Sequence, residues 1–395
     1  MIHKHRTLLP LTLHFLLAVA ILPAAADEPA DKPEPIGGNW FVTTATPPVY
    51  LYRDNDRMLD LFSWHRKDSN QDGIDNIRIS HDQQHLIIDS QGYPNHPTAI
   101  FPNSGNPNRI AVQNFQFRLP LKPQLSQSIT RLPMGPIGMA LNGVVFFNPF
   151  EQGGMNAVAG YSEVWLDSCC GHPQQTGVYH YHKYPVCVKS PFRDDGKQHS
   201  PVIGFAFDGF PIHGPWESSG TMAKDLAGDT ALDVCNGHSD PQRGYHYHVT
   251  PERFPYVLGG YHGVAELSNI RQRGTLPTGA IEDNSSGESQ LPKVIASVLP
   301  GNAVRGKKHT LKILLDPEQL RRGSLPETPP DWVQIGPFEA ESIQRLGNEV
   351  TVVVTVPDDS PAGVLMDCHL EFNTPARRLV FKRNDVFRVT VEEQP

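Results

Sequence analysis

Two short segments rich in histidine follow one pattern, and their residue types could bind a metal ion. Each segment runs Asp-x-Cys-x-Gly-His, continues for seven residues and ends in His-Tyr-His. The second copy begins at Asp233, 66 residues after Asp167 (233 minus 167), and the two align without a gap. Imidazole is the commonest metal-binding side chain, and several at fixed spacing are typical of a metal site. We call each set of three histidines a station: His172, His180 and His182 form the first, and His238, His246 and His248 form the second.

An extended strand would aim the paired histidines of a station at one point. Successive side chains of a strand alternate between faces, so His180 and His182 project together while Tyr179 and Tyr181 project from the other face. Positions i and i+2 lie about 6.5 to 7 Å apart, which lets both rings reach one ion. A turn at the preceding glycine could return His172 to supply a third nitrogen. The same layout holds for the second station.

Other polar residues could support these rings. Asp167 and Asp233 could bind the ion directly, but a carboxylate more commonly accepts the outer ring N–H of a ligating histidine. Asp208 and His213 follow a predicted strand and are candidates for the same supporting role. His199 and His262 could also approach, although a structural role explains each of these histidines, and His213, at least as well.

The alternative is an amphipathic strand with tyrosine in the core and histidine at the surface. One Tyr-His-Tyr-His motif would favour that interpretation, because short motifs often match by chance. Two copies with equal internal spacing favour metal binding instead. The stations could face each other as one dinuclear centre or lie apart as independent sites.

Imidazole ligands in an oxidising compartment suit copper or zinc. The leading prediction is therefore an exported protein that binds copper, or failing that zinc. A rival is a metal-dependent enzyme, either copper oxidase-like or a zinc hydrolase that activates water at an open coordination position. A third interpretation is an extracellular scaffold or adhesion module in which the rings only pack. The sequence shows no nucleophile elbow and no phosphate-binding glycine loop.

The beginning of the chain predicts export to the periplasm or the cell exterior. Lys4 and Arg6 precede an apolar run over 8–22, and small residues end at Ala26, so residues 1–26 are expected to be a cleaved signal peptide. Its removal leaves 32 basic residues (34 minus 2) against 42 acidic ones. A net charge of −10 gives no reason to expect nucleic acid as a partner. No later stretch is apolar enough for a membrane span.

Five cysteines in an exported chain suggest one or two disulfides. Cys169 and Cys235 occupy equivalent places in the two segments and could bridge them. Cys170 with Cys187 is the competing pair, and the sequence does not decide between them.

The composition indicates a mainly β, loop-rich fold, since the chain has 37 prolines and 33 glycines and little helical periodicity. Residues 27–38 are expected to be a disordered leader. Residues 39–267 are expected to form a β-rich domain with the internal repeat and one short helix over 222–232. A linker over 268–290 would lead to an immunoglobulin-like β-sandwich over 291–395, because strand-like runs recur there at regular spacing. The sandwich could be a spacer or dock a protein partner.

One predicted hairpin turn resembles the front of a calcium loop. Asp68, Asn70, Asp72 and Asp75 place oxygens around Gly73, but Ile79 stands where an EF-hand has its bidentate glutamate. Because Asp, Asn and Gly also favour tight turns, a solvated turn is the default and calcium the alternative.

Many short motifs between Gly92 and Gly263 occur in the order typical of one family. They include Tyr93-Pro-Asn-His96-Pro, Asn142-Gly-Val, Tyr179-His-Tyr-His182, Asp208-Gly-Phe-Pro-Ile212 and Tyr245-His-Tyr-His248. The chain thus resembles the YHYH proteins, which are mostly exported bacterial proteins without a settled activity. The resemblance implies an exported domain defined by its histidine motifs. His213 stands where the family would have Tyr, which adds a possible ligand. Gly260 stands where Cys is common, which puts a disulfide near the second station in doubt.

Overall fold

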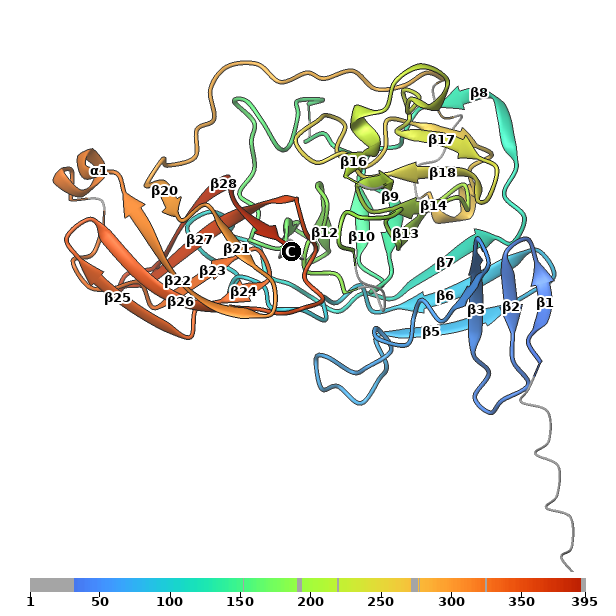
Figure 1. Cartoon of the computed structure of the whole chain (residues 1–395), viewed down its shortest axis with the longest axis horizontal. Helices are drawn as coiled ribbons and strands as arrows, with labels where there is room; N and C mark the ends of the chain where they lie inside the picture. The colour runs from blue at the N-terminus through green and yellow to red at the C-terminus, as the bar shows by residue number, and fades with distance from the viewer. Residues whose placement is uncertain are drawn as a thin grey trace, which may run out of the picture.

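A computed structural model describes residues 32–151, 153–189, 194–218, 220–270, 276, 278–323 and 325–391. The predicted signal peptide and residues 27–31 of the leader lie outside these ranges. The described chain is mainly β, as the sequence predicts, and α1 (Pro317–Arg321) is its only α-helix (Figure 1). None of its helices is long and apolar enough to cross a membrane.

Two small antiparallel sheets form the N-terminal part of the molecule. Each sheet is a meander of consecutive strands, and the burial pattern of β6 alternates along its length, as in a half-buried strand. Glu34–Gly37 form strand β1, which pairs with β2, so the prediction of a disordered leader was wrong for these four residues. The sheets contain β1 (Glu34–Gly37), β2 (Trp40–Val42), β3 (Tyr50–Asp54) and β4 (Arg57–Leu59), then β5 (Ile77–His81), β6 (His85–Ser90) and β7 (Phe115–Pro120).

An eight-stranded central sheet carries both stations. Its strand order is β11-β12-β10-β9-β13-β14-β18-β17, so the first station lies at one edge and the second at the other. The strands of one half are β9 (Pro136–Ala140), β10 (Val145–Phe147), β11 (Gly171–Pro173) and β12 (Tyr179–Tyr181). Those of the other half are β13 (Val202–Ala206), β14 (Pro211–His213), β17 (Gly237–Asp240) and β18 (Gly244–His248).

The two halves of this sheet are related by an approximate two-fold axis. At the centre of the sheet, Met139 pairs with Phe205. Phe205 lies 66 residues after Met139 and occupies the equivalent position in the second copy of the repeat. The parallel pair Phe146 and Tyr181 in β10 and β12 recurs as Ile212 and Tyr247 in β14 and β18. The repeat therefore begins near β9, well before Asp167.

At the centre of this sheet, β9 and β10 form an antiparallel hairpin. Asn142 and Gly143 form the turn, and Gly143 has φ +79°, which glycine adopts without strain. A Cβ there would lie 2.3 Å from Oγ of Ser90, so the close packing also requires glycine.

The predicted helix over 222–232 is replaced by two 3₁₀ turns, and Gly228, the first residue of the second turn, has φ +64°, which a continuous α-helix does not allow. Short elements complete this part of the chain: β8 (Leu125–Thr130), β15 (Trp216–Ser218), β16 (Thr221–Met222), η1 (Ala223–Asp225), η2 (Gly228–Thr230), β19 (Tyr261–Gly263) and η3 (Leu267–Asn269).

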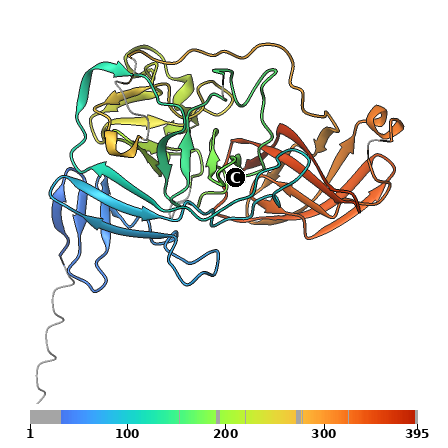
Figure 2. The ribbon, with the colours of Figure 1, turned by 180° about the vertical axis from the view of Figure 1, so that it is seen from behind.

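Two sheets pack face to face to form the C-terminal sandwich (Figures 1 and 2). Alternate residues of β26, from Val350 to Val356, are buried between the sheets together with Leu370 and Phe387 of the facing sheet. One sheet has the order β20 (Ile295–Leu299), β22 (Lys307–Leu315), β26 (Glu349–Val356), β25 (Ser342–Leu346). The other has the order β21 (Asn302–Val304), β28 (Arg378–Thr390), β27 (Leu365–Asn373), β23 (Trp332–Ile335), β24 (Phe338–Glu339).

Candidate metal centres

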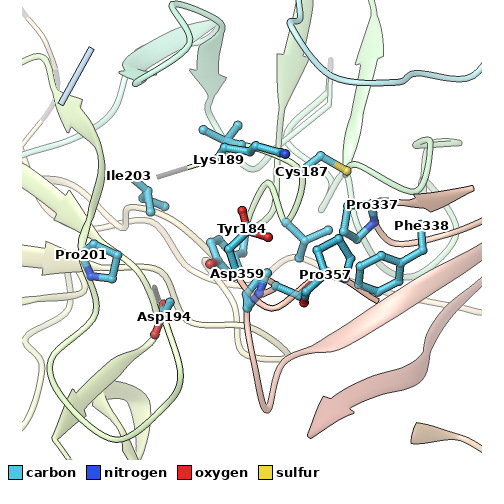
Figure 3. Close-up of a pocket in the computed structure, with 14 residues that line it drawn as sticks. Tyr184, Cys187, Lys189, Asp194, Pro201, Ile203, Pro337, Phe338, Pro357 and Asp359 are labelled. Atoms are coloured by element: carbon cyan, nitrogen blue, oxygen red, sulfur yellow. The ribbon is translucent and has the colours of Figure 1, made fainter. Parts of the chain in front are cut away.

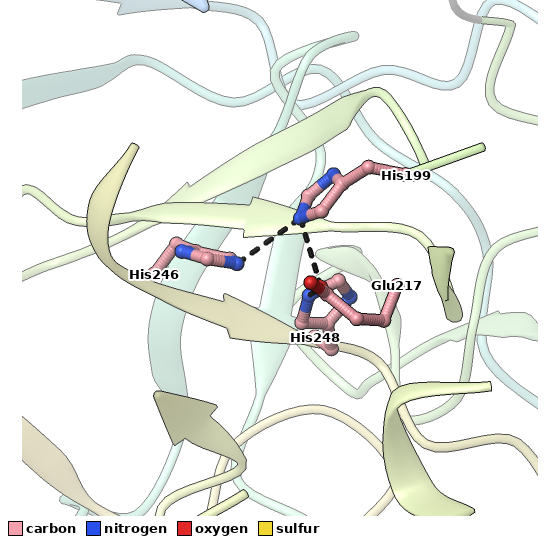
Figure 4. Close-up of side chains that lie close together, drawn as sticks. All are labelled: His199, Glu217, His246 and His248. Atoms are coloured by element: carbon pink, nitrogen blue, oxygen red, sulfur yellow. Dashed lines mark hydrogen bonds and ion pairs between the residues drawn. The ribbon is translucent and has the colours of Figure 1, made fainter. Parts of the chain in front are cut away.

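The second station gathers side chains from four separate segments. β18 supplies His246 and His248, and β17 supplies His238. His199 precedes β13, and Glu217 projects from β15 toward the rings (Figure 4).

The ligand atoms of the second station converge within metal-binding distance. Nε2 of His246 lies 3.1 Å from Nε2 of His199 and 3.2 Å from Nε2 of His238. Oε2 of Glu217 lies 3.3 Å from Nε2 of both His199 and His248, and 3.4 Å from that of His238. Bonds of about 2.0 to 2.1 Å from an ion to each ligand would separate tetrahedral neighbours by about 3.3 Å. The ligand atoms of His199, Glu217, His246 and His248 all lie within 4.8 Å of one another and fit one shared cation, and His238 adjoins this group.

Each of these rings is oriented through its other nitrogen. Nδ1 of His199, His246 and His248 donates to the backbone carbonyls of Ser200, Gly244 and Gly214. Nδ1 of His238 donates to the carbonyl of Thr230 in the same way. A neutral ring that donates from Nδ1 keeps its lone pair on Nε2, which is the usual arrangement of a metal-binding histidine.

Burial sets the charge of the second station. Burial and neighbouring histidines lower the pKa of His199 to about 3 and that of His246 to about 2. Burial would also lower the pKa of His238, but the Glu217 carboxylate beside its ring and the hydrogen bond to Thr230 raise it. Burial would raise the pKa of Glu217, yet the rings of His238 and His248 beside its carboxylate bring it well below its usual range. Oε2 of Glu217 and Nε2 of His248 are buried without a hydrogen-bond partner, and buried polar atoms normally have one.

The first station brings its three predicted histidines together. Nε2 of His180 lies 3.1 Å from Nε2 of His182, and their Nδ1 atoms donate to the carbonyls of Val178 and Asn148. The ring of His172 packs 4.6 Å from that of His180, and its Nε2 is buried without a partner. Burial lowers the pKa of all three, that of His182 to about 4.

The repeat shows what the first station lacks. Glu151 is equivalent to Glu217, but its Oε1 lies 3.8 Å from Nε2 of His182 and its side chain is 35% exposed. Pro133 stands in place of His199. Phe147 stands in place of His213, and its ring stacks 3.8 Å from that of His180. The first station therefore offers three imidazoles and one distant carboxylate.

The two stations are separate sites. Four strands, β10, β9, β13 and β14, lie between β12 and β18. With about 4.8 Å between neighbouring strands, the stations are on the order of 24 Å apart. A shared dinuclear centre is therefore ruled out in this fold.

The aspartates do not orient station rings, which corrects the expected role of Asp167 and Asp233. Asp167 accepts from the hydroxyl of Tyr179 at 2.8 Å, and Asp233 accepts from that of Tyr245 at 2.9 Å. Each also accepts backbone N–H groups of its own Cys-x-Gly turn, so it braces the turn that positions the first histidine.

Three further predicted residues lie beside the stations. Asp208 accepts from the hydroxyl of Tyr247 at 2.5 Å and contacts no station ring. His213 donates from Nδ1 to the carbonyl of Ser200, and its ring packs 4.6 Å from that of His199. His262 pairs with Asp233 at 2.6 Å.

The disulfide joins Cys169 to Cys187, with Cα atoms 5.2 Å apart. Both predicted pairings were wrong. Cys235 lies at the opposite edge of the central sheet, out of reach of Cys169, while Cys170 sits in a turn with φ +66° as a buried free thiol.

The possible calcium turn is held by its own hydrogen bonds. Asp68 accepts the backbone N–H groups of Asp72 and Gly73, and Asp72 accepts from Asn70 and Gln91. None of the potential metal-ligand groups in the described part of the chain includes Asp68, Asp72 or Asp75. These hydrogen bonds fit the expected solvated turn.

Sequence reasoning missed Glu217 and treated His199 as structural. A signal for Glu217 was present, since extending the ungapped repeat backward pairs it with Glu151. His199 has proline as its equivalent, so only the folded arrangement of β13 and β18 on either side of β14 identifies it.

The fold and its sites define a β-sheet protein with two histidine clusters that could hold metal ions. Residues 116–227 match the model of the family described as YHYH protein, so the chain carries a YHYH domain and the resemblance is confirmed. The matched region includes the first station, His199 and Glu217, whereas the three histidines of the second station lie beyond it. No curated protein and no solved structure matches the chain.

Proposed function

We propose that this protein binds two transition-metal ions, one in each station, and that it works in the periplasm or outside the cell. The proposal is carried by one observation in the second station. The Nε2 atoms of its histidines converge, while Nδ1 of each of these rings donates to a backbone carbonyl. Without a proton between them, two such Nε2 atoms at 3.1 Å present lone pairs to each other, which is unfavourable unless a cation lies between.

The donor set favours copper or zinc. Imidazole with one carboxylate and no thiolate suits Cu(II) and Zn(II), and copper has the higher affinity for nitrogen ligands. We assign His199, Glu217, His238, His246 and His248 as ligands of the second station, and His172, His180 and His182 as ligands of the first. The disulfide supports an oxidising compartment.

Metal content of the full chain without residues 1–26 tests this proposal. We expect two equivalents of copper or zinc after loading and removal of excess ion, measured by inductively coupled plasma mass spectrometry. His246→Ala should lose one equivalent, His180→Ala the other, and the double variant both. His309→Ala, which alters a histidine of the sandwich, is the matched control and should keep two. Unchanged metal content in the double variant would reject these ligands.

A second candidate is metal-dependent catalysis at the first station. Three imidazoles with a carboxylate 3.8 Å away leave a coordination position for water or substrate, whereas the second station is nearly closed by protein. Ester hydrolysis or oxygen consumption that His180→Ala abolishes and His246→Ala retains would support it. A chain that binds no metal, and whose melting temperature a chelator leaves unchanged, would instead indicate a scaffold module.

A further inference from the structure

The C-terminal sandwich packs against one edge of the central sheet, where β11 and β12 carry the first station. Lys183 follows His182 directly and is buried. Its Nζ lies 3.3 Å from Oδ1 of Asp367 on β27 and 3.4 Å from Oδ1 of Asp385 on β28. Asp367 is fully buried and also accepts the backbone N–H of Asp385, so the two carboxylates form one receptor for the ammonium group.

The other arm of the first station also contacts the sandwich. Ser168, which lies four residues before His172, donates to the carbonyl of Gln334 at 3.3 Å. The ring of Trp165 packs 4.9 Å from that of His369, and Lys382 pairs with Glu163 at 3.6 Å. Both segments that lead into and out of the first station are therefore held by the sandwich.

Beyond Lys183, the two parts of the chain separate and line a cleft between them (Figure 3). Tyr184 and Cys187 line one side, and Pro337, Phe338 and Pro357 line the other. The contacts with the sandwich near the station are thus made by Lys183 and by residues 163–169, because the chain after Lys183 lines the cleft.

The second station touches the sandwich elsewhere, since Nε1 of Trp216, beside Glu217, donates to the carbonyl of Ala362 at 3.2 Å. It has no equivalent of the Lys183 anchor. Val249 is equivalent to Lys183, and Val234 is equivalent to Ser168. The side chain of Val249 is buried, while Val234 is 60% exposed. The internal repeat thus provides a station with the same strands and no sandwich contact at these positions.

From this difference, and resting on the proposed function, we infer that the sandwich is a positioning element of the first station. Lys183, held by Asp367 and Asp385, fixes the end of β12 and with it the ring of His182. The sandwich is then part of the first metal site and not a spacer. Residues that orient ligands typically change metal affinity by about 10- to 100-fold.

Titration of the full chain without residues 1–26 tests the inference. Zn²⁺ affinity is measured by competition with a chromophoric chelator in the His246→Ala background, which isolates the first station, and in the His180→Ala background, which isolates the second. Lys183→Met should weaken the first station about 10- to 100-fold and leave the second unchanged. Lys308→Met, which removes an exposed lysine paired with Glu341, is the control.

Two further variants keep the result decisive. If Lys183→Met does not fold, Asp385→Asn removes only the partly exposed carboxylate and should weaken the first station less, while Lys183→Arg should retain most of its affinity. The inference would be overturned if the first station of folded Lys183→Met bound zinc as tightly as without this change. If Lys183→Met is unfolded, the same result in Asp385→Asn would overturn it. A wild-type first station that binds no zinc, copper or other transition ion would overturn the proposed function itself.

Discussion

The two stations are built from one repeat and differ in what surrounds them. Both place His-x-His on a short strand and return a third histidine through an Asp-braced turn. The second station adds His199 and Glu217, whereas the first has Pro133 and a distant Glu151, a disulfide nearby and the sandwich against its edge. The comparison shows that the strand pattern defines where imidazoles gather, while the residues around it decide how many ligands the ion receives.

Acid should destabilise the metal-free protein strongly, through the buried histidines of both stations. A buried histidine with a lowered pKa is neutral when folded and protonated when unfolded, so stability falls as the pH drops below 6.5 and stops falling at the folded pKa. For His182, a folded pKa of about 4 corresponds to a loss of roughly 3 kcal/mol by pH 4. In the second station, the raised pKa of His238 opposes the loss.

Urea unfolding of chelator-treated protein between pH 8 and pH 4 checks this prediction. His182→Gln should flatten the pH dependence, even if it lowers stability at neutral pH. A free energy of unfolding that stays constant over this range would show that the first-station rings are solvated in the metal-free protein.

A disulfide introduced at the second station should make it more like the first. A Cβ at Gly260 would lie 3.1 Å from Sγ of Cys235. That is close to the separation of about 3 Å between the Cβ of one cysteine and the sulfur of the other in a disulfide. Gly260 has no positive φ; the side chain of Ile129, 2.7 Å from the added Cβ, must shift, and the carbonyl of Thr130, at 3.3 Å, must move slightly. Closing this loop should stabilise the protein by about 3 kcal/mol.

Thiol titration and melting with and without reductant measure the effect of Gly260→Cys. The melting temperature should rise only under oxidising conditions, and Cys235→Ser in the same background should abolish the gain. Two titratable thiols persisting at these positions would refute the geometric match.

Removing the charge of Glu217 should weaken metal binding at the second station only. Glu217→Gln keeps the size of the side chain but takes an anion away from the Nε2 atoms of His199, His238 and His248, which lie 3.3 to 3.4 Å from Oε2. We expect at least a tenfold loss of zinc affinity, about 1.4 kcal/mol, by chelator competition in the His180→Ala background. An unchanged affinity would remove Glu217 from the ligand set.

The equivalent change at the first station should have the smallest effect. Glu151→Gln alters a carboxylate that lies 3.8 Å from Nε2 of His182 and whose side chain is 35% exposed. We expect less than about a threefold change in affinity in the His246→Ala background, because a partly solvated carboxylate beyond hydrogen-bond distance interacts weakly. A loss as large as that of Glu217→Gln would mean that the first station closes around its ion and that the two sites are equivalent.

Much of the local structure was predictable from the sequence. Alternating apolar residues located the strands of the sandwich, and the His-Tyr-His spacing placed paired rings on one strand face. The disulfide was not predictable, because adjacent Cys169 and Cys170 look alike in sequence and only the turn at Cys170 separates them. The role of Asp167 as the acceptor of the Tyr179 hydroxyl was not predicted. The sequence pattern placed Tyr179 on the face opposite the histidines and gave no partner for its hydroxyl.

The sequence by itself determined the repeat, the mainly β fold and the six histidines, because side-chain alternation and fixed spacing act within one strand or turn. Only the tertiary structure decided that the stations lie at opposite edges of one sheet, that His199 and Glu217 join the second, and that Lys183 anchors the first to the sandwich. These facts depend on contacts between residues far apart in the chain. Such contacts follow from strand order and packing, which local patterns do not encode.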